Sequence, residues 1–214
     1  MIFPPKCTFC HKLLSADDKK SKICSECRNN LILYPEPYYA EGLVENTDVC
    51  YAPLEYTGMV RESLHRYKFS GCSFYADVYA EIICSALGKE LSSCDIITWV
   101  PLSKRRLRER GYDQAELIAA AVSRRIGIKC VRMLDKIRNI KPQSGIGEYK
   151  LRKNNIKDAY KLSKDGELLR LNDPAVLIVD DIVTTGATIG ECSRVLKCAG
   201  FSHVIACCAA GRAR

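Results

Sequence analysis

The chain has 214 residues, of which 47% are hydrophobic, and its formal net charge is +8. This length accommodates one ordinary core and a small accessory module. The sequence contains no run of about 18 apolar residues and does not start with the charged-then-apolar order of a secretory signal, so we expect a soluble, cytoplasmic protein. The positive charge favours a polyanionic ligand, either a nucleotide-sized polyphosphate or a nucleic acid.

Residues 1–37 carry two C-x2-C pairs, Cys7 with Cys10 and Cys24 with Cys27, separated by thirteen residues. Each pair presents two thiolates from one turn, so together they predict a closed, tetrahedral, structural site like that of a zinc ribbon. Four thiolates favour zinc over iron. Bound zinc would supply most of the folding free energy of so short a segment, on the order of 10 kcal/mol. The alternative is a redox pair or unrelated thiols.

The rest of the N-terminal segment has weaker signals. His11 follows the first pair and is expected to be a solvated turn residue and not a metal ligand. A short helix is predicted over residues 26–33, and the prolines at 35 and 37 mark the boundary of the module. The other nine of the thirteen cysteines are expected to be small, reduced core residues.

Strands and helices alternate along residues 38–214. A strand is predicted over residues 49–56, followed by helices over residues 59–69 and 75–87. A short apolar strand at residues 95–100 precedes a basic loop. An amphipathic helix then covers residues 113–126, with Asp113 as its N-cap.

The C-terminal part completes the alternation. Residues 138–155 have no apolar periodicity and are predicted to form a long loop, either a ligand-covering lid or a mobile insertion. An apolar strand at residues 176–179 is followed by an acidic pair, a helix at residues 187–198 and a final strand at residues 204–209. This order predicts an α/β domain whose mainly parallel sheet is flanked by helices.

The acidic pair, Asp180 and Asp181, follows a strand of that sheet, where ligands of open α/β sheets bind. Two adjacent carboxylates can hold the vicinal hydroxyls of a ribose, directly or through Mg²⁺. The residues after them offer three hydroxyls and a glycine turn into a helix N-terminus, an arrangement that cradles a phosphate monoester. These residues are Thr184, Thr185, Gly186, Ala187 and Thr188.

Two other classes with an acid after a strand are excluded by what the chain lacks. A Walker-type ATPase needs G-x4-G-K-[ST], and the only Gly-Lys pair here, at residues 88 and 89, is followed by Glu90. A receiver domain needs a phospho-acceptor strand well downstream of its acidic pair, and too little of the chain follows Asp181.

Residues 176–188 resemble the signature with which type I phosphoribosyltransferases bind phosphoribosyl pyrophosphate (PRPP). Further features resemble the ComF-type competence proteins of that superfamily, and the likeness runs through nearly the whole chain. These features are the zinc-ribbon-like N-terminus, Pro101 with Arg105 and Arg108, the run from Arg110 through Asp113 to Ala115, and Gln143 with Arg152 and Asn155. Asp113 stands where we would expect an asparagine.

The resemblance implies a phosphoribosyltransferase-type fold and a set of ligand contacts. Asp180 and Asp181 would contact the ribose hydroxyls and Mg²⁺, and Thr184 to Thr188 would hold the 5'-phosphate. The basic loop, with Arg105 and Arg108, would face the pyrophosphate, since guanidinium groups pair well with phosphate oxygens. Lys68 fits the family pattern of a pyrophosphate-side lysine loosely. If catalysis occurs, the implied catalytic residues are Asp180, Asp181 and Arg105.

Three functions fit one such site. The ComF resemblance implies a PRPP-binding protein that handles single-stranded DNA during DNA uptake and natural transformation, with competence-machinery proteins as further partners. Backbone contacts would then come from residues 104–110, and stacking from Tyr38, Tyr39, Tyr51 or Tyr56. The alternatives are an active Mg²⁺-dependent phosphoribosyltransferase of nucleotide salvage or biosynthesis, and a zinc-ribbon adaptor without ligand affinity. Glutamine-dependent amidotransfer is not expected, because the first cysteine, Cys7, belongs to a metal pair.

Overall fold

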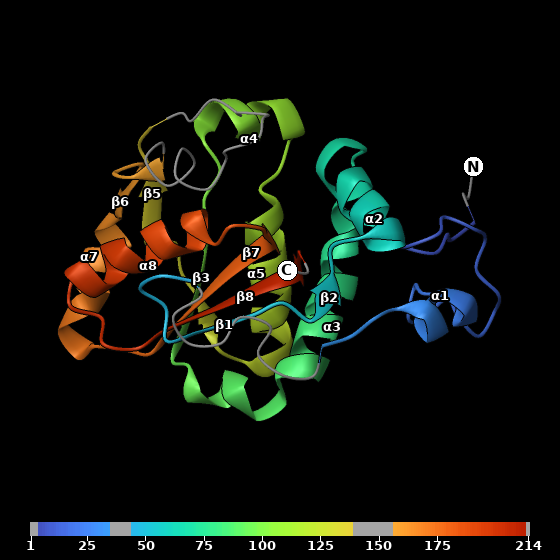
Figure 1. Ribbon diagram of the computed structural model, residues 1–214, viewed down its shortest axis with the longest axis horizontal. Helices are drawn as coiled ribbons and strands as arrows, with labels where there is room; N and C mark the ends of the chain where they lie inside the picture. Colours follow the sequence, from blue (N-terminus) through green and yellow to red (C-terminus); the bar gives the residue numbers. More distant parts are fainter. Residues whose placement is uncertain (1–3, 35–43, 139–155, 213–214) are drawn as a thin grey trace.

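A parallel β-sheet forms the centre of the protein in the computed structural model, which describes residues 4–34, 44–138 and 156–212 (Figure 1). The strand order is β1-β8-β7-β3-β4, with β2 beside β8, and every pairing in this sheet is parallel. The strands are β1 (Val49–Tyr51), β2 (Leu54–Glu55), β3 (Ile96–Trp99), β4 (Lys129–Cys130), β7 (Val176–Val183) and β8 (Val204–Gly211).

Helices cover both faces of this sheet (Figure 1). The α-helices are α1 (Ser25–Asn30), α2 (Gly58–Phe69), α3 (Ala76–Leu87), α4 (Lys104–Arg110), α5 (Gln114–Ile126), α7 (Lys164–Leu169) and α8 (Ala187–Cys198). Short 3-10 turns are η1 (Ser73–Tyr75), η2 (Gly88–Ser93) and η3 (Arg170–Asn172). Helices α3 and α5 pack on one face of the sheet, and α8 packs on the other.

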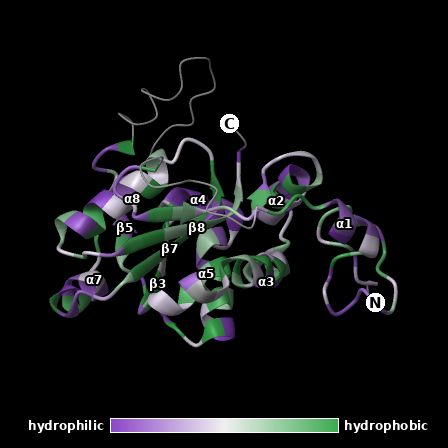
Figure 2. Cartoon of the chain, turned by 60° about the horizontal axis from the view of Figure 1, so that its bottom comes forward, coloured by the Kyte–Doolittle hydropathy of each residue, from purple (hydrophilic) through white to green (hydrophobic). Residues whose placement is uncertain are grey.

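The apolar run of β7 is continuous because both of its faces are buried. Leu177 and Val179 belong to the core cluster under α3 and α5, whereas Val176 and Ile178 belong to the cluster under α8. Successive side chains of a strand point to opposite faces, so a strand with two covered faces needs apolar residues at every position. Figure 2 shows this hydrophobic character along β7 and β8.

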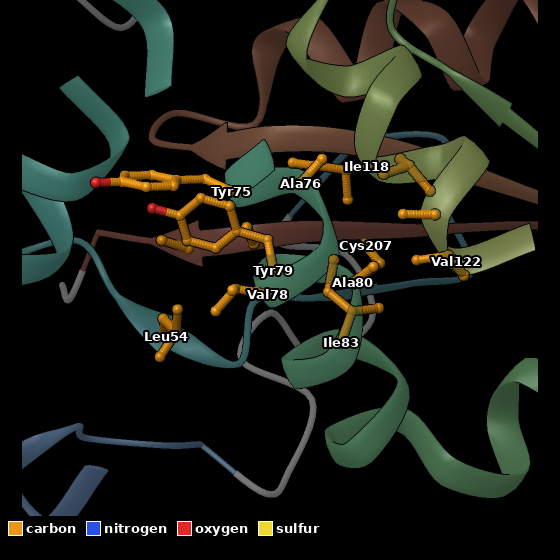
Figure 3. Packing of buried hydrophobic residues seen from close by; sticks show 14 of the residues in the cluster. Leu54, Tyr75, Ala76, Val78, Tyr79, Ala80, Ile83, Ile118, Val122 and Cys207 are labelled. Carbon is orange, nitrogen blue, oxygen red and sulfur yellow. The ribbon is translucent and has the colours of Figure 1, made fainter. Parts of the chain in front are cut away.

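The larger core cluster joins the sheet to α3 and α5. Tyr79 and Ile83 of α3 and Ile118 of α5 are fully buried and gather with Cys207 of β8 (Figure 3). Cys207 shows how the cysteines outside the N-terminal pairs are used. Five of those nine are buried, three are half-buried and Cys198 is exposed.

A separate antiparallel pair, β5 (Leu134–Lys136) with β6 (Tyr160–Leu162), stands beside the main sheet. Hydrogen bonds fix its position: the Met133 amide donates to Thr98 Oγ1 at 3.2 Å, and the Ser163 amide donates to the Met133 carbonyl at 2.9 Å. The predicted long loop at residues 138–155 connects these strands and, apart from Arg138, lies outside the described residues.

The N-terminal cysteine module packs directly on the main domain. The fully buried Phe9 ring meets the Tyr79 ring edge-to-face, with centroids 6.3 Å apart, and Arg66 of α2 donates to the carbonyls of Thr8 and Phe9. The module therefore shares the core of the main domain in addition to any metal-dependent stability. Its predicted boundary at residues 35–37 lies outside the described residues.

The predicted fold class is confirmed, with three local corrections. The basic run after β3 is the helix α4 and not a loop, because Ser103 caps its start and Gly111 ends it with a φ of 80°. Strand β7 continues through the acidic pair to Val183 instead of ending at Val179. The predicted strand at residues 49–56 is split into β1 and β2, where Pro53 has no N–H for the sheet. No described helix is long and apolar enough to cross a membrane.

Candidate functional site

Asp180 and Asp181 line one cavity of about 360 Å³, which lies at the carboxyl-terminal part of β7 and the residues that follow β3. The Asp181 amide donates to Asp180 Oδ1 at 2.8 Å. Burial, followed by the negative charge of Asp181, raises the pKa of Asp180. Two neighbouring acids in a partly buried cavity favour a cation or a hydroxyl-rich ligand beside them.

Lys68 supplies one such cation. Its Nζ lies 2.9 Å from Asp181 Oδ2, and both side chains are mostly buried. The preceding residue, Tyr67, is fully buried and donates from its hydroxyl to the Gln114 carbonyl at 2.8 Å. The end of α2 is thereby fixed against α5, next to the cavity that Lys68 lines.

The residues after the acidic pair form a cradle at the start of α8. Gly186 is the N-cap residue, with a φ of 73°, and a Cβ atom there would lie 2.9 Å from Val44 Cγ2. Glycine is therefore required both by the backbone angle and by space. Thr184, Thr185 and Thr188 line a small hollow with Gly186, in front of the amide groups of the helix start. A phosphate group fits the charge and hydrogen-bonding character of this hollow.

The basic helix α4 divides its arginines between two sides. Arg106 and Arg110, four residues apart, line the cavity. Arg105 and Arg108 do not: both are exposed, and Arg105 Nε lies 2.7 Å from Glu109 Oε1. The arginines that line the cavity are thus neighbours of the pair expected from the sequence, because residues three or four apart share one face of a helix and adjacent residues do not.

Asp113 holds two parts of the site together. Its Oδ2 accepts from the Leu102 amide at 2.7 Å, and its Oδ1 accepts from the Ala115 and Glu116 amides at the start of α5. The predicted N-cap role is confirmed, and the additional bond ties the loop after β3 to α5. Burial raises the pKa of Asp113 to about 6.

Four residues that line the cavity are not among the individual site residues predicted from the sequence: Arg106 and Arg110, which it placed only within the basic run, and Lys136 and Tyr160. The two arginines were detectable, since Ser103 and Gly111 bracket one short helix with defined faces. Lys136 and Tyr160 sit on β5 and β6, in short segments without a distinguishing pattern. Gln143, Arg152 and Asn155, which carry part of the family resemblance, lie outside the described residues.

The four predicted metal ligands come together. The sulfur atoms of Cys7, Cys10, Cys24 and Cys27 all lie within 4.8 Å of one another, and those of Cys10 and Cys24 are 3.6 Å apart. Tetrahedral zinc with bonds of about 2.3 Å needs sulfur–sulfur distances of about 3.8 Å, so the cluster fits this ion. His11 is exposed and stays outside the cluster, as expected.

We expect purified protein to contain one zinc ion per chain, and Cys24→Ser to lose it, because three thiolates and a hydroxyl bind zinc far more weakly. Elemental mass spectrometry of both proteins measures the metal. Cys198→Ser, at an exposed cysteine outside the cluster, should keep the zinc. A wild-type protein that holds iron, or a Cys24→Ser variant that keeps its zinc, would contradict this assignment.

Asp113→Asn should remove a pH dependence of folding. The folded-state pKa is raised from 3.8 to about 6, so the favourable contribution of Asp113 is present below about pH 4 and is lost as the pH rises to about 6. The difference in unfolding free energy, wild type minus Asp113→Asn, should therefore fall by at most about 3 kcal/mol across this range. Urea unfolding at pH 4 and pH 6.5 measures it. A difference that stays constant, or matches that of exposed Asp165→Asn, would refute the assignment.

Comparison with known proteins agrees with the family resemblance. DNA utilization protein YhgH of Salmonella typhimurium is 29% identical over 162 residues, which cover 72% of this chain and 68% of the relative. Competence protein F of Haemophilus influenzae is 26% identical over 86% of this chain and 88% of its own length. Competence protein ComFC of Bacillus subtilis is 28% identical over 66% of this chain and 55% of its own.

No protein-family model matches the chain. Among solved structures, an allosteric regulatory enzyme of purine biosynthesis aligns with a TM-score of 0.41 and 19% identity, over 64% of this chain and 26% of that enzyme. These three sequence relatives each cover 66% or more of the chain. The chain is a homologue of the ComF-type competence proteins, the group that its sequence resembles.

Proposed function

We propose that this protein binds PRPP with Mg²⁺ and acts in the cytoplasm in competence, handling single-stranded DNA during DNA uptake. The observation that carries the proposal is the shared cavity: the acidic pair, Lys68 and the inner arginines of α4 surround one space beside the phosphate cradle. A ribose that carries a 5'-phosphate and a pyrophosphate needs all three groups close together: carboxylates for its hydroxyls, basic side chains for the pyrophosphate, and a cradle for the 5'-phosphate. The relatives' names, competence protein and DNA utilization protein, support the DNA-directed role.

Each part of the ligand would contact a different group of residues. The cradle from Thr184 to Thr188 binds the 5'-phosphate through backbone amides and hydroxyls, and Asp180 and Asp181 face the ribose hydroxyls. Arg106 and Arg110 face the pyrophosphate, together with Lys68 once it leaves Asp181. When bound, Mg²⁺ would neutralise charge between the carboxylates and the pyrophosphate oxygens.

Single-stranded DNA would bind next to this cavity, on the outer side of α4. Arg105 and Arg108 point their charges to solvent there. Of the predicted stacking residues, Tyr51 and Tyr56 are half-buried, and Tyr38 and Tyr39 lie outside the described residues. Phe69 is the better platform, because it is 61% exposed and has the Arg110 guanidinium 5.0 Å from its ring centroid. Exposed aromatic rings beside cations bind unstacked bases.

The second candidate is an active phosphoribosyltransferase, favoured by the same cavity. An acceptor base would donate an electron pair to C1 of PRPP as the C1–oxygen bond breaks, and the electron pair of that bond would leave on pyrophosphate. Lys68, Arg106 and Arg110 would stabilise the charge of the pyrophosphate. Base-dependent release of pyrophosphate that is abolished by Asp181→Ala would establish this activity. If no base stimulates pyrophosphate release although PRPP binds, the protein has the binding function without the transferase activity.

We expect calorimetric titration to show PRPP binding in the presence of Mg²⁺, and Asp181→Asn to weaken it at least tenfold, because that side chain faces the ribose and the metal. Asp165→Asn, an exposed aspartate on α7, is the matched control and should bind as wild type does. If wild type shows no affinity, the zinc-ribbon adaptor without a ligand remains, and the proposed function is wrong.

The double variant Arg105→Gln/Arg108→Gln should weaken binding of single-stranded DNA and reduce the steepness of its salt dependence. Two lost phosphate contacts lower the slope of log K against log salt by about 1.4. Fluorescence anisotropy with labelled oligonucleotides over a salt series measures this. Arg170→Gln, an exposed arginine in η3, is the control. An unchanged slope in the double variant would remove α4 from the DNA-binding surface.

A further inference from the structure

Lys136 and Tyr160 form a cross-strand pair on the wall of the ligand cavity. The register of β5 and β6 places them directly opposite each other. Lys136 Nζ donates to the Tyr160 hydroxyl at 2.8 Å and lies 4.8 Å from the centroid of its ring. Both residues line the cavity together with Asp180 and Arg106.

The scaffold beneath this pair holds it in place. Tyr160 is 3% exposed, and its neighbours Ala159 and Leu134 are buried in the core cluster under α8. The Ser163 hydroxyl donates to the Arg132 carbonyl, and the Ser163 amide donates to the Met133 carbonyl, so the β5–β6 pair is fixed at the end opposite to the segment that connects the two strands. The lysine amine is therefore positioned by packing before any ligand arrives.

Lys136 differs from Lys68 in the groups that surround its amine. Within residues 4–34, 44–138 and 156–212 it forms no ion pair, whereas Lys68 in the same cavity pairs with Asp181. Burial and the positive charge of Arg106 lower the pKa of Lys136, and the more weakly coupled groups Cys192, Asp180 and Asp113 oppose this. Its hydrogen-bond partner is a neutral phenol, because burial raises the pKa of Tyr160 far above its usual range.

Among the described residues, the Lys136 amine therefore has no anionic partner. The phosphate groups of a phosphorylated ligand would provide one. We propose that Lys136, oriented by Tyr160, contacts the anionic oxygen atoms of the ligand and takes up a proton from solvent when the ligand binds. The inference rests on the proposed function, since the cavity must accept a phosphorylated ligand. An anion beside the amine favours its charged form, so the lone pair on Nζ gains a proton at any pH where the free amine is partly neutral.

Calorimetry in two buffers of different ionisation enthalpy measures both the affinity for the ligand and the number of protons taken up on binding. At pH 8 to 9, wild type titrated with PRPP and Mg²⁺ should show proton uptake. Lys136→Met should bind at least tenfold more weakly and lose that uptake. Lys136→Arg should keep most of the affinity without the uptake, because guanidinium stays charged at this pH. Lys161→Met, the exposed neighbour on β6, should match wild type.

The outcomes separate this inference from the function on which it rests. If wild type binds PRPP and Lys136→Met binds equally well with the same proton uptake, the inference is wrong and the proposed function stands. If wild type does not bind PRPP, the proposed function fails, and the same titrations are made with inorganic pyrophosphate and Mg²⁺. Equal affinity of wild type and Lys136→Met for pyrophosphate, or no binding by either, then overturns the inference too. The Lys136→Arg result distinguishes a lost charge from a disturbed fold.

Discussion

Two carboxylates side by side at the end of a buried strand are the constraint on which the rest of the structure depends. Asp180 and Asp181 lie near the carboxyl end of β7, and the charge of Asp181 adds to burial in raising the pKa of Asp180. The surrounding elements bring positively charged side chains to this negative charge. Helix α2 brings Lys68 to Asp181, α4 brings Arg106 and Arg110 to the same cavity, and β5 brings Lys136. The cavity is thus prepared for a ligand that supplies hydroxyls to the acids and anions to the bases.

The same geometry would let one short basic segment make the two kinds of contact that we propose. As a loop, residues 104–110 would offer all their charges to one ligand. As the helix α4, they separate: Arg106 and Arg110 line the cavity, while Arg105 and Arg108 are exposed. A small ligand and a nucleic-acid backbone can then be bound on two sides of a single helix. This arrangement would link the proposed PRPP site to the proposed DNA-binding surface.

The sequence predicts those parts whose signals are local. Continuous apolar residues identify β7, the cap at Asp113 identifies the start of α5, and two cysteine pairs identify the cluster that could hold a metal ion. It does not predict features that depend on tertiary neighbours. Lys136 becomes a site residue only because the β5–β6 register places it opposite Tyr160, and the N-terminal module becomes part of the core only because Phe9 meets Tyr79. The helical form of α4 lies between these cases, since its capping residues are present in the sequence.

The most direct measurement is a crystal structure of the protein with PRPP and Mn²⁺, which stands in for Mg²⁺ and is located by its anomalous scattering. Our account predicts the 5'-phosphate against the amides from Gly186 to Thr188, the ribose hydroxyls at Asp180 and Asp181, and the metal beside those carboxylates. Density for the ligand anywhere else, with this cavity empty, would contradict it.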